Sequence, residues 1–599
     1  MCLTEAASFA SLRHLFATML LFGPPADPGA LWKKHSTSLA DDFYLEAARR
    51  PEQCSSALRE KIEVQALRHI QEILIANGKS LEDFPGLPTL PLDLGATDVD
   101  GILAHELSYD RASQEAILTE RVGKLNPEQH AAWTTIKDAI DSLRNEVFFI
   151  SGGAGSGKTY LYGLILAYVR SKAEVALAVA SSGIAAQLLP GGRTAHSLLR
   201  IPLELHDSSM CAISRQSTTA SLLRSARLLL WDEAVMTHRR AFEAVDRTLR
   251  FIRDNPTPFG GGVVVLGGDW RQALPVIPRA SRAEIIDATL KNSYLWSSIK
   301  VLHLSRNERV GSGSPAAARA TEDWVRWLEQ VGQGTLPTTD GLITLPEANV
   351  VPGVSVDRLI DTVFPDFQSH ISDPNSAAQW VADRAILAMR NTDVDRLNNA
   401  VLERLPGDTL CSYSADSIAD PDDASNYPIE FLNQLSFSGL PNHQLVLKPG
   451  VPVILLRNID VVHSLCNGTR LIVRRMTLRV LEAEIATGKD RGTIVLLPRI
   501  SLTLSDPSCP IPLRRTQFPV RPAFAMTVNQ AQGQTLKGLV GRYLNTTPFS
   551  SMSPPVGPTD LTASVFCCRT GQTPPCPPAP RTSSGRRSSI DSTLLFSPV

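Results

Sequence analysis

The glycine-rich segment Gly152–Thr159, with the sequence GGAGSGKT, offers the clearest chemistry in this 599-residue chain. It follows the apolar run Val147–Ile150 and precedes the amphipathic segment Tyr160–Arg170, which predicts a strand, a phosphate-binding loop and a helix. Glycines let backbone N–H groups approach a polyphosphate at a helix N-terminus. Lys158 would then reach the β- and γ-phosphates, and Thr159 would ligate Mg²⁺. The alternative is a glycine-rich turn that binds nothing.

Two adjacent carboxylates, Asp232 and Glu233, follow a second apolar run, Leu228–Trp231. Hydrolysis of a nucleoside triphosphate needs a carboxylate that holds Mg²⁺ and one that polarises the attacking water. We assign these roles to Asp232 and Glu233 respectively. An Asp-Glu pair after a strand is common on protein surfaces, but downstream of a phosphate loop it predicts catalysis.

The elements that must position these residues alternate between strand and helix from Leu125 onward, a pattern typical of a parallel sheet covered on both faces. Val175–Ala180 and Val263–Leu266 are two further strand candidates, and polar residues follow each of them directly. Open α/β sheets bind their ligands at the carboxyl ends of strands. The polar clusters are therefore expected to share one site.

Composition restricts the possible functions little. The formal net charge is -1, which does not indicate nucleic acid, although a local basic groove fits within a neutral total. The nine cysteines show no zinc-type spacing, so we expect reduced thiols in a cytosolic or nuclear protein. The apolar run Leu15–Phe22 follows Arg13 and His14, but the chain ahead of it is not basic and no cleavage site follows, so we do not expect a signal peptide. No run has membrane-spanning length.

Seven motifs, in order and spacing, resemble those of superfamily-one DNA helicases of the petite-integration-frequency (PIF) type, in particular the helicase half of Helitron transposon proteins. They are Leu125–Gln129, Gly152–Thr159, Ala180–Ala185 with Gly191–Ser197, Asp232–Ala234, Gly267–Pro275, Asn307–Arg309 and Met526–Leu536. The resemblance implies two RecA-like α/β domains, with ATP and Mg²⁺ as cofactors and single-stranded DNA and duplex junctions as partners.

The resemblance also implies roles for individual residues. Gln129 resembles an adenine reader, Gln272 a γ-phosphate sensor and Arg309 an arginine finger from the second domain. Alternatives remain open: Gln129 as a helix cap and Arg309 as a surface residue. The expected nucleotide contacts are Gln129, Gly152, Gly153, Ala154, Gly155, Ser156, Gly157, Lys158 and Thr159.

Hydroxyl and amide side chains in two of the motifs resemble those that hold the DNA backbone, and such groups suit contacts that ignore base sequence. His196 has the alternative of a packed core residue. The expected DNA contacts are Ser181, Ser182, Thr194, His196, Ser197, Thr527, Asn529 and Gln532.

The pattern of expected helices and strands gives the domain limits, and the resemblance identifies the two α/β units as RecA-like and the β insertion as SH3-like. The disorder of the last segment is predicted from its Pro- and Ser-rich composition. The expected units are a helical N-terminal region (1–122), a first RecA-like domain (123–305), a second RecA-like domain (306–444 and 506–545), an SH3-like β-barrel insertion within it (445–505), and a disordered tail (546–599).

Two departures from the family pattern affect the expected activity. Gln530 stands where the family usually has lysine. The family also continues into a strand and an arginine, within a Y-V-A-L-S-R-like segment, that supply a second γ-phosphate contact; here the expected position falls near Thr559, and no arginine occurs between Arg542 and Arg569. The break suggests an altered reading frame or a decayed element, and predicts slow ATP hydrolysis.

The sequence therefore predicts an ATP-dependent helicase that moves 5′ to 3′ on single-stranded DNA, with roles in DNA repair, recombination, telomere maintenance or transposition. We expect it in the nucleus, with mitochondria or cytoplasm as further locations, and without a membrane association. The alternative is a decayed transposon protein that binds ATP and DNA with little turnover. The oligomeric state is not predicted.

Overall fold

The structure is a computed structural model, and its contacts divide the chain into two units. The first unit comprises Met1–Trp270, Leu274–Asn307 and Pro406–Ala523, and the second comprises Arg271–Ala273, Glu308–Leu405 and Phe524–Val599. The residues described below are 9–48, 56–77, 79–90, 103, 106–277, 280–308, 315–337, 350–351, 355–366, 380–418, 427–437, 439–460, 463–488, 490–503, 511, 513–532, 538–543 and 564–568.

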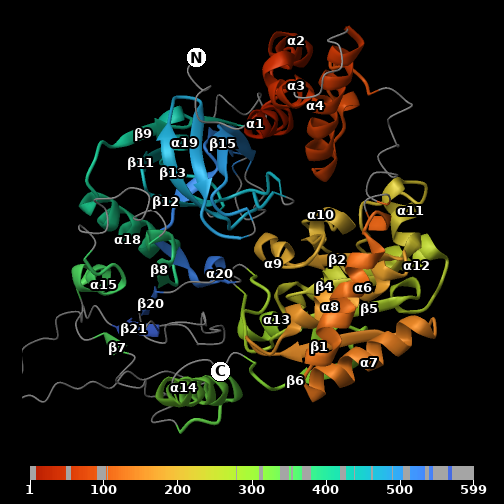
Figure 1. The fold of residues 1–599 in the computed structure, drawn as a ribbon. Coiled ribbons are helices and arrows are strands. Elements are labelled where there is room, and N and C mark those ends of the chain that lie inside the picture. The colour runs from red at the N-terminus through yellow and green to blue at the C-terminus, as the bar shows by residue number, and fades with distance from the viewer. Residues whose placement is uncertain are drawn as a thin grey trace, which may run out of the picture. The chain divides into compact units, whose positions relative to one another are not determined.

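A six-stranded parallel sheet with the order β3-β2-β4-β5-β1-β6 forms the core of one part of the first unit (Figure 1). The strands predicted from the apolar runs are confirmed. The strands are β1 (Val147–Gly152), β2 (Val175–Ala180), β3 (Arg193–Thr194), β4 (Ala226–Asp232), β5 (Val263–Gly268) and β6 (Ile299–Leu304).

Both faces of this sheet are buried, which explains why its strands read as continuous apolar runs. In β1, Phe148 and Ile150 pack in one hydrophobic cluster, whereas Val147 and Phe149 pack in another. The helices of this domain are α7 (Pro127–Asp141), α8 (Lys158–Ser171), α9 (Gly183–Gln187), α10 (Ala195–Leu199), α11 (Thr218–Ser225), α12 (Arg239–Arg253) and α13 (Arg282–Asp287).

Antiparallel strands make up another part of the first unit, and they extend beyond the predicted limits of 445–505. Sheets β15-β14-β13-β12-β18, β10-β17-β16 and β11-β9 share this region. The predicted limits were too narrow because β9 and β10 pair with strands that lie far away in the sequence. The strands are β9 (Leu410–Tyr413), β10 (Ala415–Ile418), β11 (Gln444–Leu447), β12 (Pro452–Leu455), β13 (Arg470–Met476), β14 (Val480–Ile485), β15 (Ile494–Pro498), β16 (Ile500–Thr503), β17 (Leu513–Gln517) and β18 (Val520–Pro522), with helix α19 (Ile429–Gln434) among them.

The N-terminal part of the chain is helical, as the sequence predicts. Its core gathers apolar residues such as Phe16, Trp32 and Ile70. The helices are α1 (Phe9–Phe22), α2 (Pro28–Leu39), α3 (Asp41–Ala48), α4 (Ser56–Ala76) and α6 (Arg111–Arg121). No helix within the described ranges is long and apolar enough to cross a membrane.

The second unit contains a five-stranded parallel sheet with the order β19-β8-β20-β21-β7. Asn398 on α18 fixes the edge strand, since its side chain accepts from Ala525 N at 2.8 Å and donates to Ala525 O at 3.2 Å. The elements are α14 (Pro315–Gln333), β7 (Val350–Val351), α15 (Val356–Val363), β8 (Arg384–Ala388), α18 (Asn391–Arg404), β19 (Ala525–Thr527), α20 (Val528–Ala531), β20 (Gly538–Tyr543) and β21 (Ser564–Cys568).

Strand β21 corrects two predictions about the end of the chain. The segment 546–599 is not disordered throughout, because Ser564–Cys568 lies in the sheet between β20 and β7, with Val540 opposite Val565 and Phe566 opposite Val350. The prediction that the family's last strand is missing is also wrong. The Pro- and Ser-rich composition around these residues concealed a short apolar run whose partners lie far away in the sequence.

Candidate nucleotide-binding site

The loop between β1 and α8 has the backbone conformation that its glycines allow. Gly155 and Gly157 have φ angles of 83° and 81°, in the left-handed region that favours glycine. A Cβ atom at Gly155 would lie 2.3 Å from Asn307 Oδ1, and one at Gly157 would lie 2.3 Å from Gln129 Nε2. The loop is therefore closely surrounded, and a larger residue would displace its neighbours.

Lys158 is the first residue of α8, and its side chain is buried. Its Nζ donates to Gly152 O at 2.6 Å and to Gly153 O at 3.2 Å, so the ammonium group lies over the loop itself. These carbonyl oxygens hold the charge at the helix N-terminus, where backbone N–H groups and the helix dipole attract anions. The arrangement suits a phosphate group, which would draw Lys158 away from the carbonyls.

The carboxylate pair stands at the carboxyl end of β4. Asp232 is buried, and its Oδ1 accepts from Glu233 N at 2.8 Å. Glu233 has a φ of 52°, an uncommon value for a residue with a side chain. Its Oε2 is buried without a hydrogen-bond partner among the described residues. A buried carboxylate oxygen without a donor is costly, and it identifies a place for a ligand or water.

Burial also sets the protonation of this pair. Burial raises the pKa of Asp232, while the nearby Lys158 charge opposes the shift. Burial raises the pKa of Glu233 as well, and the neighbouring Asp232 carboxylate adds to the effect. An acid that is reluctant to ionise is a suitable proton acceptor once a cation balances the charge.

Tyr162 is a residue of this site that sequence reasoning missed. Its side chain is fully buried on α8, one turn after Thr159, and its hydroxyl lies close enough to Asp232 for that carboxylate to raise the tyrosine pKa further beyond the effect of burial. A Cβ atom at Gly267 would lie 1.7 Å from this hydroxyl oxygen. The only sequence signal for Tyr162 was its helical spacing from Thr159. That spacing places both residues on one face of the helix but does not show that Tyr162 lies near Asp232.

Gln129 caps its helix, which was the alternative left open by the sequence. Asn126 Oδ1 accepts from Gln129 N at 2.8 Å, and Gln129 Oε1 accepts from Asn126 N at 3.1 Å, forming a capping box with Pro127 at the first helical position. Gln129 Nε2 also donates to Ser156 O at 3.0 Å. The amide thus connects α7 to the phosphate loop, and an adenine base would have to displace these bonds.

Ser181 connects the first candidate DNA motif to the carboxylate pair. Its Oγ donates to Glu233 O at 2.7 Å and accepts from Trp231 Nε1 at 3.1 Å, and it lies 2.7 Å from Thr237 Oγ1. Because the parallel strands β2 and β4 are neighbours, their carboxyl ends lie side by side. A movement at Ser181 would therefore reach the backbone of Glu233 directly.

The other candidate DNA residues occupy helix starts or surfaces. Ser182 caps α9 by accepting from Ala185 N at 3.2 Å, and Thr527 caps α20 by accepting from Gln530 N. Gln532 Nε2 donates to Gln272 Oε1 at 3.0 Å, and both residues belong to the second unit. Thr194 is buried, whereas His196, Ser197 and Asn529 are exposed. Exposure of His196 does not support its alternative as a packed core residue.

Arg309 lies outside the described residues. The remaining predicted residues fit Mg²⁺ and ATP on three counts: glycines where a Cβ would collide, a helix N-terminus that begins with lysine, and a buried carboxylate oxygen without a partner. Thr159, directly after Lys158, and Asp232 are the oxygen donors that Mg²⁺ prefers.

This parallel sheet, its phosphate loop and its carboxylate pair define a P-loop nucleoside triphosphatase domain of the RecA-like kind. Residues 124–341 match the family model of the PIF1-like helicases, and residues 430–476 match that of the 2B domain of the DNA helicase Pif1. These two segments are similar to the PIF1-like helicases, which supports the resemblance that the motifs indicate. The Helitron type stays a prediction.

Curated relatives agree with this family. The chain is 28% identical over 356 residues to the ATP-dependent DNA helicase Pif1 of a Psychrobacter species. This match covers 59% of this chain and 48% of the relative. It is 26% identical over 403 residues to human ATP-dependent DNA helicase PIF1, covering 66% of this chain and 54% of the relative. The chain thus spans about half the length of these two relatives.

A solved structure from a study of DNA unwinding at forked duplex DNA by two coordinating Pif1 helicases has a similar fold. The TM-score is 0.50 at 21% sequence identity, and the match covers 71% of this chain and 88% of that chain. This likeness concerns the fold alone.

Proposed function

We propose that this chain is an ATP-dependent DNA helicase that moves 5′ to 3′ along single-stranded DNA and opens duplex junctions. The observation that carries the proposal is that the phosphate loop, the carboxylate pair and the Ser181 motif all follow the carboxyl ends of strands of one parallel sheet. The hydrogen bond from Ser181 to the Glu233 carbonyl would thereby connect the DNA-binding motif to the site of ATP hydrolysis.

Mg²⁺-bound ATP supplies the phosphoanhydride bond whose cleavage drives the cycle. Lys158 would leave the Gly152 and Gly153 carbonyls and bind the β- and γ-phosphates, while Thr159 and Asp232 hold the metal. Glu233 would orient the attacking water and accept its proton at Oε2, the atom without a partner in the described chain. Gln272 would sense the γ-phosphate, and Arg309 would reach it from the second domain, as the family resemblance implies.

The change in ATP state would reach DNA through Ser181. Its hydroxyl holds the Glu233 carbonyl, so a shift of Glu233 during hydrolysis would alter the loop that begins α9. Ser182, Thr194, His196 and Ser197 would contact the backbone of the strand there. Thr527, Asn529 and Gln532 would do so from the second domain.

Strand β21 bears on how complete the catalytic machinery is. Arg569 directly follows Cys568, the last residue of β21, and itself lies outside the described residues. The family pattern places an arginine directly after such a strand, so we assign the second γ-phosphate contact to Arg569. This assignment favours an active enzyme over the decayed binding protein that the apparent gap suggested.

The Arg569→Ala variant distinguishes an active enzyme from a decayed binding protein. An arginine finger contributes on the order of 10³-fold or more to phosphoryl transfer, so DNA-stimulated ATP hydrolysis should fall steeply. Arg581→Ala, a change in the same tail, is the control and should retain the parental rate. Slow hydrolysis by the parental protein, unchanged by Arg569→Ala, would instead support the decayed protein.

DNA binding is tested separately from hydrolysis. The candidate contacts are hydroxyls and amides that suit phosphates, so binding should prefer single strands and ignore base sequence. Affinity should fall as salt rises because bound counterions are released. Fluorescence anisotropy with matched single strands and blunt duplexes, at one salt concentration, measures this preference. Equal affinity for both would contradict the helicase proposal.

The biological setting follows from the family alone. We propose a nuclear location and a role in genome maintenance, such as repair, recombination or telomere upkeep, or in transposition if the chain is of the Helitron type. Imaging of the tagged full chain tests the location, since a purely cytoplasmic signal would contradict it.

A further inference from the structure

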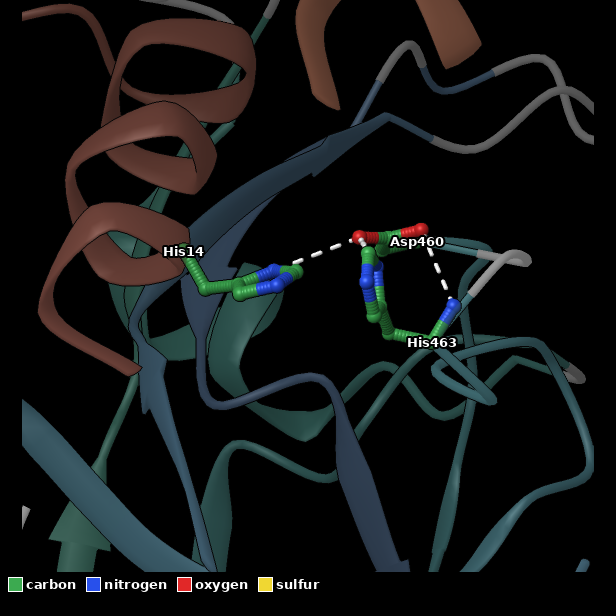
Figure 2. A group of neighbouring side chains, drawn as sticks. All are labelled: His14, Asp460 and His463. Carbon is green, nitrogen blue, oxygen red and sulfur yellow. Dashed lines mark hydrogen bonds and ion pairs between the residues drawn. The ribbon is translucent and has the colours of Figure 1, made fainter. Parts of the chain in front are cut away.

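Three side chains that could bind a metal meet where helix α1 contacts the loop after β12. His14 comes from α1, and Asp460 and His463 come from the loop (Figure 2). One ligand atom from each lies within 4.8 Å of the others. His14 Nδ1 is 3.2 Å and His463 Nδ1 is 2.7 Å from Asp460 Oδ2. Figure 2 shows the three groups facing one another.

We propose that His14, Asp460 and His463 bind a divalent transition-metal ion, with Zn²⁺ as the best-suited ion, and that this ion fastens α1 to the antiparallel region. Two imidazoles and one carboxylate are a typical zinc donor set, with a fourth position left for water. Ligand atoms around a tetrahedral Zn²⁺ ion with bonds of about 2.0–2.1 Å lie roughly 3.3 Å apart. The His14–Asp460 separation already matches this spacing.

The contact between His14 and Asp460 lacks a hydrogen bond that would explain it. His14 Nδ1 is buried and makes no hydrogen bond, although it faces a carboxylate oxygen. His14 Nδ1 and Asp460 Oδ2 thus lie 3.2 Å apart in buried surroundings without a hydrogen bond between them. A shared cation would make this contact favourable.

Asp460 is held in place before any metal binds. Leu465 N donates to Asp460 O at 2.7 Å, Asp460 N donates to Leu465 O at 2.9 Å, and His463 N donates to Asp460 Oδ1 at 3.2 Å. Asn77, at the end of the α4 region, donates to Ile459 O at 2.8 Å. These bonds orient the carboxylate, which lowers the cost of assembling the site.

The charges around the site are compatible with a cation. Arg13 is next to His14 in the sequence, and Asp42 binds it through two hydrogen bonds of 2.7 Å, which neutralises its charge locally. Arg193 also interacts electrostatically with Asp460, and the carboxylate of Glu106 shares that interaction. His69 accepts from Arg13 Nε at 3.2 Å rather than facing the site as a cation. A Zn²⁺ ion bound by two neutral imidazoles and one carboxylate would give the site a net charge of +1. A water molecule would occupy the fourth coordination position.

The inference does not depend on the helicase proposal, and zinc titration of the chelator-treated full chain tests it. The parental protein should bind one Zn²⁺ at this site, and His463→Gln and Asp460→Asn should weaken that binding at least about tenfold. His463 is half-exposed, so its substitution leaves the fold intact even if His14→Gln does not. His35→Gln, an exposed histidine on α2, is the control and should bind like the parent.

Two further readouts separate this site from other metal contacts. Co²⁺ should give a visible absorption band typical of tetrahedral nitrogen ligation in the parent, and His463→Gln should lose it. Zn²⁺ should also slow hydrogen exchange in α1 but leave α8 unchanged. Absence of zinc uptake by the folded parent, or uptake that all three substitutions leave unchanged, would show that the cluster is only a hydrogen-bonded carboxylate with two histidines.

Discussion

The nucleotide edge of the first parallel sheet and the junction of α1 with the antiparallel region place their chemical groups in different ways. At the nucleotide edge, Lys158 and Glu233 each directly follow a strand or its loop, so the sheet brings their motifs together. At the junction, His14 and Asp460 come from distant segments with no motif around them. Regular architecture makes a site recognisable in sequence, whereas packing between segments does not.

Buried carboxylates show the same difference. Glu233 has an oxygen without a partner, as expected where a ligand is to bind. Asp416, in the antiparallel region, accepts from Arg515 Nε and from Arg515 Nη2 at 2.7 Å, and both side chains are fully buried. The remaining Arg515 donors bind the carbonyls of Leu432, Leu435 and Pro441. A fully satisfied charge indicates structure, and an unsatisfied one indicates function.

The largest expected effect concerns the nucleotide edge. Lys158→Ala should abolish ATP hydrolysis, a loss of at least about 10²-fold, because the γ-phosphate loses its nearest cation. The fold should persist, since within the described chain the lysine donates its hydrogen bonds to loop carbonyls. Lys172→Ala, at the other end of α8, is the control. A coupled ATPase assay with circular dichroism measures both, and a parental rate would place the site elsewhere.

Glu233→Gln separates chemistry from binding at the same edge. The amide keeps the shape of the side chain but cannot accept a proton, so hydrolysis should fall by about 10²-fold or more while ATP affinity is retained. Equilibrium binding of ATP, alongside single-turnover hydrolysis, provides the comparison with the exposed Glu204→Gln control. Collapse of ATP affinity would assign Glu233 a structural role.

Asp416→Ala tests a buried carboxylate that is paired with an arginine, in contrast to Glu233. Removing one partner of a buried ion pair leaves Arg515 uncompensated and should lower the free energy of unfolding by about 3–5 kcal/mol. The exposed Asp408→Ala is the matched control and should change it by less than about 0.5 kcal/mol. Urea denaturation followed by fluorescence gives both values. A small effect for Asp416→Ala would mean that solvent reaches Arg515.

Ser181→Ala should have a moderate effect that sharpens the link between hydrolysis and DNA. The variant leaves Trp231 Nε1 without its acceptor and frees the Glu233 carbonyl, at a cost of about 1–3 kcal/mol in stability. Stimulation of ATPase activity by single-stranded DNA should fall several-fold, with basal hydrolysis less affected. Ser208→Ala, in an exposed loop, is the control. Equal loss of basal and stimulated rates would contradict the coupling role.

The smallest expected effect concerns the chemical labelling of cysteine thiols in the first parallel-sheet domain and in the antiparallel region. Burial raises the pKa of Cys211 and of Cys466 to about 11, whereas Cys411 is exposed. A raised thiol pKa keeps the reactive thiolate scarce below that pH, so iodoacetamide at pH 8 should label Cys411 before Cys211 and Cys466, as peptide mass spectrometry would show. Because the folded state holds these protons longer, stability should fall as pH rises from about 9 toward 11. Rapid labelling of Cys466 would indicate opening of the α9 contact with its loop.

The sequence by itself determined the nucleotide site and its sheet. Apolar runs of four to six residues, each followed by polar motif residues, predict parallel strands, and GGAGSGKT requires a phosphate loop because its glycines allow positive φ. Asn126 and Pro127 likewise predict the start of α7. These features depend on neighbours within a few residues, so local physics fixes them.

Only the tertiary structure decided the rest. The pairing of β21 with β20 and β7, the wide limits of the antiparallel region, the contact of Tyr162 with the carboxylate end of β4 and the meeting of His14 with Asp460 join residues far apart in the chain. Each depends on which buried surfaces fit together after folding, and no spacing along the chain encodes such a fit. At β21 the composition gave a wrong prediction. Its five apolar or small residues form a strand because they pair with neighbouring strands, although the sequence around them is rich in Pro and Ser.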